Sequence, residues 1–200
     1  MEILYQDENI IVVIKPVGID SEKGVIEALK EQFSGEIFTI HRLDLNVGGV
    51  MVYARNKKWA ASLSKCIQEN TMIKEYVAMV HGFPPLKEDW SDFLFKDSRK
   101  NKVFVVKKER KGVKKARLEY EVLQSYEDTS LVHIRLHTGR SHQIRVQFAS
   151  RKFPLVGDHK YGSKDDKTSP MLYSCKITFP YKGKNVSFTS FPSWANIQSV

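Results

Sequence analysis

The residues best suited to chemistry lie in the stretch from His41 to Gly49. Its single carboxylate, Asp44, comes two positions after Arg42. A nearby guanidinium favours the charged form of a carboxyl group, so Asp44 is expected to be an anion at neutral pH. An anion held on a rigid scaffold can serve as a reactive group. The structural alternative is that His41, Arg42 and Asp44 form an ion pair that caps the next strand.

The residues that follow Asp44 predict how it is held. Gly48 and Gly49 allow the backbone to turn tightly or to approach a ligand closely. The run Val50–Ala54 is apolar and contains β-branched residues, which is typical of a buried strand. Asp44 is therefore predicted to lie in a loop just before a core strand.

A second polar group follows residue 137. Thr138 or Ser141 is predicted to cap a helix there, with Ile144 and Phe148 directed inward. The N-terminus of a helix is a natural binding site for anions. Three side chains are expected to surround this end of the helix: Arg140, His142 and Gln143.

Positive charge is concentrated between Lys96 and Arg117, where eleven Lys and Arg residues oppose two acidic ones. The whole chain carries a net charge of +9. A strand at Val103–Val106 and a turn at Glu109–Gly112 indicate that residues 96–117 form a basic β-hairpin. Crowded like charges favour a polyanionic partner, and a phosphate backbone fits best. The alternative is a solvated edge strand guarded by lysines. Four lysines are expected to contact the phosphate backbone: Lys107, Lys108, Lys111 and Lys114.

Hydrophobic periodicity places the remaining elements. Helices are predicted at residues 21–33, with Ser21 as the cap, and at residues 57–69. Strands are predicted at residues 3–5, 10–14, 72–81, 131–137, 172–179 and 186–190.

Composition excludes several classes of protein. The 200 residues are 42% hydrophobic and 28% charged, which indicates a soluble globular chain of one domain. Cys66 and Cys175 are too few for a disulfide framework or a metal motif, and both are interpreted as small core residues. No signal peptide or membrane span is evident, so the protein is expected in the cytoplasm. No GxGxxG or P-loop pattern occurs, so no nucleotide cofactor is expected, and no metal either.

Several segments together resemble the RluA family of pseudouridine synthases. The first is His41–Asp44, with a glycine five positions after the aspartate. The second is the strand containing Lys74–Ala78, and the third is Gly139–Arg145 with the later Gly157–Gly162. They occur in the family's order, and the resemblance covers essentially the whole chain. The family usually has Thr-Ser-Gly at Val47–Gly49, so two hydroxyl groups near the site are missing here.

The resemblance implies an α+β fold. We expect a single catalytic domain over residues 1–200, with a curved, mostly antiparallel mixed sheet flanked by helices and loops. The N-terminal S4-type RNA-binding domain of many relatives is not expected. The implied activity is isomerisation of specific uridines in structured RNA, either rRNA or tRNA, to pseudouridine, by a monomer without a cofactor.

The resemblance also assigns roles to residues. Asp44 takes the reactive role, either as a nucleophile on the anomeric carbon or as a base on a sugar proton; the sequence leaves both open. Arg145 would pair with Asp44, and Tyr76 would pack against a uracil flipped out of its stack. Arg42 would fill the space that the flipped base leaves in the RNA, or hold the RNA backbone near that space. The residues expected to contact RNA besides the lysines are His41, Arg42, Arg140, His142, Gln143 and Ile144.

Two other functions compete with the isomerase. One is a catalytically inactive RNA-binding module on the same scaffold, and the presence of Asp44, Tyr76 and Arg145 argues against it. The other is a nuclease, for which the sequence lacks a metal-ligand cluster.

Overall fold

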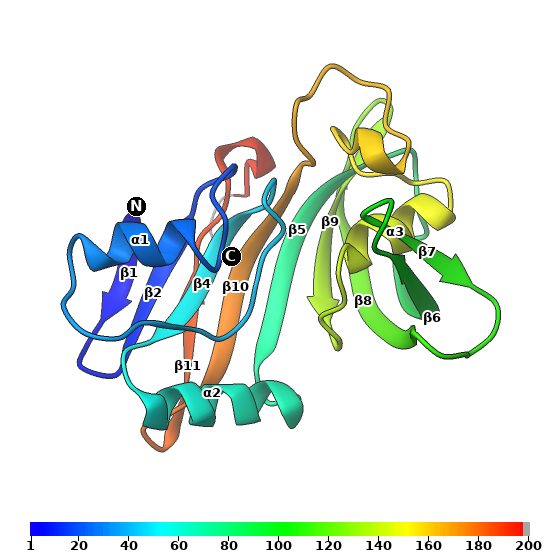
Figure 1. The fold of residues 1–200 in the computed structure, drawn as a ribbon. Helices are drawn as coiled ribbons and strands as arrows, with labels where there is room; N and C mark the ends of the chain where they lie inside the picture. Colours follow the sequence, from blue (N-terminus) through cyan, green and yellow to red (C-terminus); the bar gives the residue numbers. More distant parts are fainter. Residues whose placement is uncertain (198–200) are drawn as a thin grey trace. The chain divides into compact units, whose positions relative to one another are not determined.

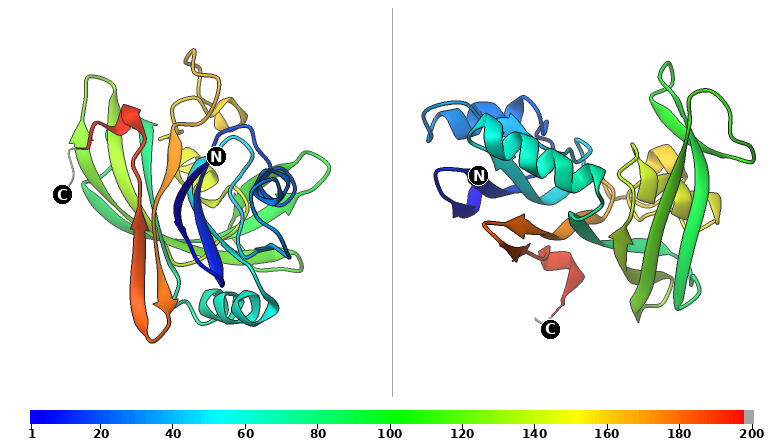
Figure 2. Two further views of the ribbon diagram at one scale, coloured as in Figure 1. Left: turned by 90° about the vertical axis from the view of Figure 1, so that its left-hand side faces the viewer. Right: turned by 90° about the horizontal axis from the view of Figure 1, so that it is seen from below.

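The computed structural model describes residues 1–197, and the chain forms two compact units. The first unit contains Met1–Glu75 and the segment that begins at Tyr173; the second contains Tyr76–Leu172. Each unit is a sheet with helices packed against it, which confirms the predicted α+β class (Figures 1 and 2). Within residues 1–197, no helix is long and apolar enough to cross a membrane. The single catalytic domain expected over residues 1–200 stays a prediction.

The sheet of the first unit is mixed, with the strand order β1-β2-β4-β10-β11 and a short β3 that also pairs with β4. Strand β2 is antiparallel to β1 and β4, whereas β10 is parallel to β4. The strands are β1 (Glu2–Gln6), β2 (Ile10–Lys15), β3 (Phe38–Thr39), β4 (Gly48–Ala54), β10 (Leu172–Tyr181, in this unit from Tyr173) and β11 (Lys184–Thr189). The helices are α1 (Gly24–Lys30), α2 (Lys57–Gln68) and a 3-10 turn, η2 (Ser193–Ala195).

The core of the first unit is built on β2 and β4. Every residue of β4 is buried, as the apolar run in the sequence predicted. Val12 lies opposite Val52 in the antiparallel pair, and both belong to a cluster that includes Leu63 and Cys66 of α2. Alternation along β4 directs Tyr53 to the other face, where its hydroxyl donates to the carbonyl of Ser21 (2.7 Å). Helices therefore have to cover both faces of these two strands.

The helix predicted at residues 21–33 is shorter, and Ser21 is not its cap. Helix α1 begins at Gly24, and the carboxylate of Asp20 accepts from the backbone N–H groups of Glu22 and Lys23 (2.9 and 2.8 Å). The Ser21 hydroxyl is instead turned toward the backbone of the loop that carries Asp44. Tertiary hydrogen bonds thus replaced the local cap that the sequence suggested.

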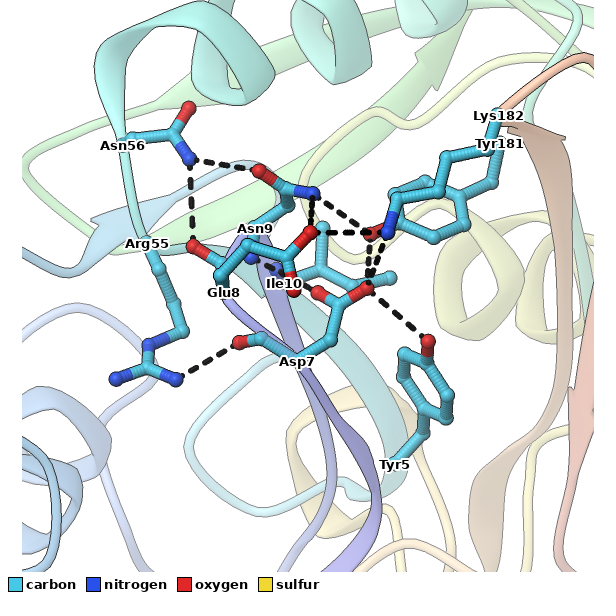
Figure 3. Close-up of polar contacts among 9 residues, drawn as sticks. All are labelled: Tyr5, Asp7, Glu8, Asn9, Ile10, Arg55, Asn56, Tyr181 and Lys182. Carbon is cyan, nitrogen blue, oxygen red and sulfur yellow. Dashed lines mark hydrogen bonds and ion pairs between the residues drawn. The ribbon is translucent and has the colours of Figure 1, made fainter.

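A polar cluster ties the ends of the first sheet together (Figure 3). The carboxylate of Asp7, in the turn between β1 and β2, accepts from the backbone N–H groups of Asn9 and Ile10. It also accepts from the Tyr181 hydroxyl and from the Lys182 ammonium, at the turn between β10 and β11. Burial alone would raise the pKa of Asp7, but these hydrogen bonds hold the pKa well below its usual range. The network is therefore a structural clamp in which the partly buried carboxylate is matched by donors and by a cation.

The sheet of the second unit has the order β5-β9-β8-β6-β7. The strands are β5 (Ile73–His81, in this unit from Tyr76), β6 (Lys87–Asp97), β7 (Lys102–Val106), β8 (Val113–Ser125) and β9 (Thr129–Leu136). Its helices are α3 (Gln143–Ser150) and a 3-10 turn, η1 (His159–Tyr161). Strand β6 is antiparallel to both β7 and β8, and β8 is antiparallel to β9.

Strand β6 was not predicted, and it changes the basic hairpin expected over residues 96–117. It lies between β7 and β8, so the two basic strands flank a third instead of pairing with each other. No clear strand pattern marks β6 in the sequence, because the charged Asp92 lies between Trp90 and Leu94 on the inward-facing side of the strand. In the structure this carboxylate accepts from Arg151 (2.9 and 3.1 Å) and from Gln147 (2.7 Å) near the C-terminal end of α3. Only the tertiary partner makes an aspartate acceptable there.

Gly49 offers a direct test of this architecture. It pairs with Ser174 of β10 at a φ of +127°, and an added Cβ would lie 2.3 Å from the Ser174 carbonyl oxygen. Gly49→Ala should therefore lower the free energy of unfolding by roughly 3 kcal/mol or more, from combined clash and backbone strain. Gly183→Ala is the matched control, since its φ is +82° but a Cβ would meet open space. Urea denaturation should show a much smaller loss for Gly183→Ala; equal losses would contradict the close-contact explanation.

Candidate active site

Asp44 lies in the first unit, in a turn directly before β4. The backbone N–H of Val47 donates to the carbonyl of Asp44 (3.0 Å), which closes a four-residue turn. Asp44 itself is half-buried, while β4 behind it is fully buried. The prediction of a carboxylate in a loop before a core strand is confirmed.

Hydrogen bonds fix the backbone on both sides of Asp44. On one side, the Ser21 hydroxyl donates to the Leu43 carbonyl (2.9 Å) and accepts from the Leu43 N–H (3.1 Å). On the other side, the Leu45 carbonyl accepts from the Gly18 N–H (2.9 Å) and from the Lys15 ammonium (3.3 Å). The turn that presents Asp44 is thus held by the last residue of β2 and by the segment between β2 and α1.

Lys15 belongs to this neighbourhood too; the sequence placed it at the end of a strand but assigned it no role in the site. Its side chain is 0% exposed, and Nζ also donates to the carbonyls of Pro16 (2.9 Å) and Ile19 (2.8 Å). Burial lowers the pKa of Lys15 to about 8, although the carboxylates of Asp20 and Asp44 act in the opposite direction. A lysine at the end of an apolar strand was the available signal, but nothing local shows that it turns inward.

His41 and Arg42 have different environments. Burial, with a smaller contribution from the charge of Lys74, lowers the pKa of His41 to about 3. His41 is therefore neutral, and its Nε2 accepts from the Val52 N–H (3.3 Å). Arg42 is exposed and forms an ion pair with Glu22 (3.1 Å). An exposed pair contributes little to stability, so Arg42 can exchange Glu22 for another anion. Contact of either residue with RNA stays a prediction.

Tyr76 and Arg145 both lie in the second unit, and both are 6% exposed. Tyr76 is on β5, in the predicted strand. Arg145 is on α3, where Nε and Nη2 donate to the two carboxylate oxygens of Asp158 (2.7 and 2.8 Å). The family resemblance assigns Arg145 the partner Asp44, which stays a prediction, and it does not assign Asp158 as a partner. The Gly157-Asp158 dipeptide belonged to the resemblance, but it had been given no role.

The start of α3 also differs from its prediction. His142, not Thr138 or Ser141, is the N-cap residue, with a left-handed backbone (φ 51°) and no side-chain cap. The loop before the helix is held by Gln143, whose Oε1 accepts from the Thr138 hydroxyl (2.7 Å) and the Arg140 N–H (3.0 Å). Gln143 and Ile144 are buried, so their side chains support this loop and the core from within. Ile144 and Phe148 point inward, as predicted.

The cations of the basic segment remain at the surface. Arg140 is exposed, and its Nε donates to the carbonyl of Lys115 on β8 (3.0 Å), which places it beside that segment. The loop between β7 and β8, green in Figure 1, extends from the ends of both strands. Exposed lysines lie in this loop and on the start of β8: Lys107, Lys108, Lys111 and Lys114.

Comparison with known proteins now defines the class. The family model described as RNA pseudouridylate synthase matches residues 9–150. The chain belongs to this family of RNA pseudouridine synthases. Among solved structures, human RNA Pseudouridylate Synthase Domain Containing 1 superposes with a TM-score of 0.83 over 96% of this chain and 83% of that chain. Its 24% sequence identity supports likeness of fold.

Relatives with known names share about a third of their residues with this chain. Ribosomal large subunit pseudouridine synthase D of Borreliella burgdorferi is 34% identical, over 96% of this chain and 64% of the relative. Dual-specificity RNA pseudouridine synthase RluA of Salmonella typhi is 34% identical, over 93% of this chain and 90% of the relative. The chain spans 54% to 66% of the length of the first three relatives.

Lys15 gives a pH-dependent prediction. Its folded pKa of about 8 lies below its ordinary value of 10.5, so the unfolded chain binds more protons between these pH values. Wild-type stability should therefore rise with pH across this window, by up to about 1.4 kcal/mol per pH unit from this group. Lys15→Met lacks the group.

The measurement is the free energy of unfolding of both proteins from pH 7 to 10.5. The difference, wild type minus Lys15→Met, should be flat below pH 8 and then increase. Lys30→Met, at an exposed helix position, should give a curve parallel to wild type. If the curve of Lys15→Met were also parallel to that of the wild type, Lys15 would not be buried as a cation.

Proposed function

We propose that this chain is an RNA pseudouridine synthase that isomerises uridine in structured RNA by means of Asp44. The observation that carries the proposal is the placement of Asp44. In a chain that belongs to the family, this carboxylate lies on a turn whose backbone is fixed by Ser21 and Lys15. Such rigidity is what a reactive group requires, because small displacements reduce rates strongly.

The proposed reaction is balanced without a cofactor. The bond between N1 of uracil and C1′ of ribose breaks, and the detached uracil rotates. A bond from C5 to C1′ then forms, the proton on C5 is lost, and N1 gains a proton. No net oxidation or reduction occurs, so binding, orientation and proton transfer suffice. Asp44 starts the sequence, either by attack on C1′ or by removal of a sugar proton.

Tyr76 and Arg145 supply the environment of the reaction in this proposal. A flipped uracil needs a flat, apolar surface, and the ring of Tyr76 is of the right kind. The guanidinium of Arg145 pairs with Asp44 and keeps it charged and oriented. Arg42 exchanges its exposed partner Glu22 for the RNA, close to the position that the flipped base leaves.

RNA is held by the exposed cations of the second unit. The contact of Arg140 with the Lys115 carbonyl places Arg140 beside β8, the strand that the basic loop enters. The first relatives carry names that refer to the large ribosomal subunit, so large-subunit rRNA is the proposed substrate, with tRNA as the second choice. The monomeric state and the cytoplasmic location expected from the sequence stay predictions. No observation favours the inactive RNA-binding module.

The basic surface can be tested by its salt dependence. Changing Lys107, Lys108, Lys111 and Lys114 together to Ala should weaken RNA binding and flatten the plot of log Kd against log salt. The slope should change by roughly 0.7–0.9 for each RNA phosphate that a lysine no longer neutralises. The single-turnover rate of isomerisation, measured when all RNA is bound to protein, should change little.

The matched control removes four exposed lysines from the first unit: Lys23, Lys30, Lys57 and Lys58. This control has the same net charge as the test variant. If the two variants have equal slopes, the loop is only a solvated surface and the effect is one of net charge.

Asp44→Asn tests the reactive role. The amide is nearly isosteric but is neither a useful nucleophile nor a base, so isomerisation should become undetectable. The assay is release of tritium from C5 of labelled uridine in a transcript of bacterial large-subunit rRNA. Binding of the RNA should persist, because the change removes a negative charge.

Asp166→Asn, at an exposed position, is the control and should retain wild-type turnover. Melting temperatures of both variants should lie close to that of the wild type. A purely structural role for Asp44 predicts a lower melting temperature with normal activity of the folded fraction. Wild-type turnover in folded Asp44→Asn protein would end the proposal.

A further inference from the structure

We propose that Asp158 is a positioning residue for the synthase reaction, which holds the guanidinium of Arg145 in one orientation. The inference rests on the proposed function of Arg145. Arg145 and Asp158 are 6% and 1% exposed, and two parallel hydrogen bonds join Nε and Nη2 to the two carboxylate oxygens. Because the guanidinium is planar, this double contact fixes both its plane and its rotation. The edge that carries Nη1 is then directed away from Asp158.

Tyr161 supports the guanidinium from a second direction. Its ring centroid lies 5.2 Å from Cζ of Arg145, within the range of a cation–π contact. The ring is itself fixed, because its hydroxyl accepts from the Val103 N–H (2.9 Å) and hydrogen-bonds to Nδ1 of His142 (2.8 Å). Strand β7 and the N-cap of α3 therefore hold the ring of Tyr161, in η1, against Arg145.

The turn that carries Asp158 is also rigid. The Asp158 carbonyl accepts from the N–H groups of Tyr161 (3.0 Å) and Ser163 (3.1 Å). Before it, Gly157 has a φ of +80°, and an added Cβ would lie 2.1 Å from a backbone oxygen. The Gly157 N–H donates to the carboxylate of Asp165 (2.9 Å), which also contacts Nε2 of His81 at the end of β5 (2.9 Å). The carboxylate of Asp158 is thus placed by its own loop before it meets Arg145.

The energetics favour a positioning role over a purely stabilising one. A buried ion pair contributes little net stability compared with apolar residues of similar volume, because both charges lose their hydration. What the pair does supply is a fixed geometry. The role proposed for Arg145 requires such a fixed geometry, because small displacements of a catalytic group reduce rates strongly.

The test compares two variants that each break a bidentate arginine–aspartate pair at α3. Asp158→Asn removes the pair at Arg145. Asp92→Asn removes the pair with Arg151, whose Nη1 and Nη2 donate to the two carboxylate oxygens of Asp92 (2.9 and 3.1 Å) just beyond the C-terminal end of the helix. Arg151 also stacks on an aromatic ring, Trp90, at 4.2 Å, so the second pair likewise combines a carboxylate with an aromatic ring, although its side chains are more exposed (29% and 13%).

Two readouts are taken below the melting temperature of both variants. The first is solvent exchange of the Arg145 Nε–H in ¹⁵N–¹H spectra, assigned by its loss in Arg145→Lys. It should be protected in the wild type and in Asp92→Asn, and exposed in Asp158→Asn. The second is the single-turnover rate of tritium release from labelled large-subunit rRNA transcript. It should fall about 100-fold in Asp158→Asn and stay unchanged in Asp92→Asn, with the same RNA affinity in all three proteins.

Three outcomes would overturn the inference: retained protection of Nε–H in Asp158→Asn, exposed Nε–H with a wild-type rate, or equal losses of rate in the two variants. If Asp158→Asn does not fold, Asp158→Glu replaces it, because it keeps the charge but displaces it by one methylene. A wild-type rate in folded Asp158→Glu would likewise overturn the inference. A wild-type protein that releases no tritium from rRNA or tRNA would overturn the proposed function instead, and the exchange measurement would still decide whether Asp158 fixes Arg145.

Discussion

A charged group that is taken out of water must have its polar atoms bound by other groups, and this constraint shapes the loop that carries Asp44. The ammonium of Lys15 is buried at the end of β2, and it binds the carbonyls of Pro16, Ile19 and Leu45. These carbonyls belong to two separate segments of the chain. If either segment moved, a buried cation would be left without one of its acceptors, so the whole region is held in one arrangement.

The second unit meets the same constraint with a different pair of groups. Arg145 is buried, and its charge is matched by Asp158 and by the ring of Tyr161. In each unit, then, a buried cation organises the loops around residues that the family resemblance assigns to the active site. The tight backbone contact of Gly49 with Ser174 also fixes the start of β4, directly after the loop that carries Asp44.

The exposed cations follow the opposite rule. Arg42 and Glu22 are 62% and 54% exposed, and water screens the attraction between them. The lysines of the loop between β7 and β8 are also exposed. Such groups can change partners at little cost, which suits contact with a mobile polyanion. The chain thus uses its basic residues in two ways: buried ones order the backbone, and exposed ones remain available for a ligand.

The sequence by itself determined the elements whose signal is local, together with the family. The apolar runs at β2 and β4, the stripe of α2 and the glycine pair after Asp44 could all be recognised because hydrophobic period and glycine conformations depend on neighbours in the chain. Tertiary structure alone decided the rest. Ser21 is typical of a helix cap in the sequence, but in the structure it binds Leu43. The charge of Asp92 obscured the pattern of strand β6, and Arg151 balances that charge in the fold. The role of Asp158 follows only from its contact with Arg145. Each of these depends on a polar partner 13 to 59 positions away. The physical reason is that a buried polar group is acceptable only beside its partner, and the fold, not the local pattern, brings the two together.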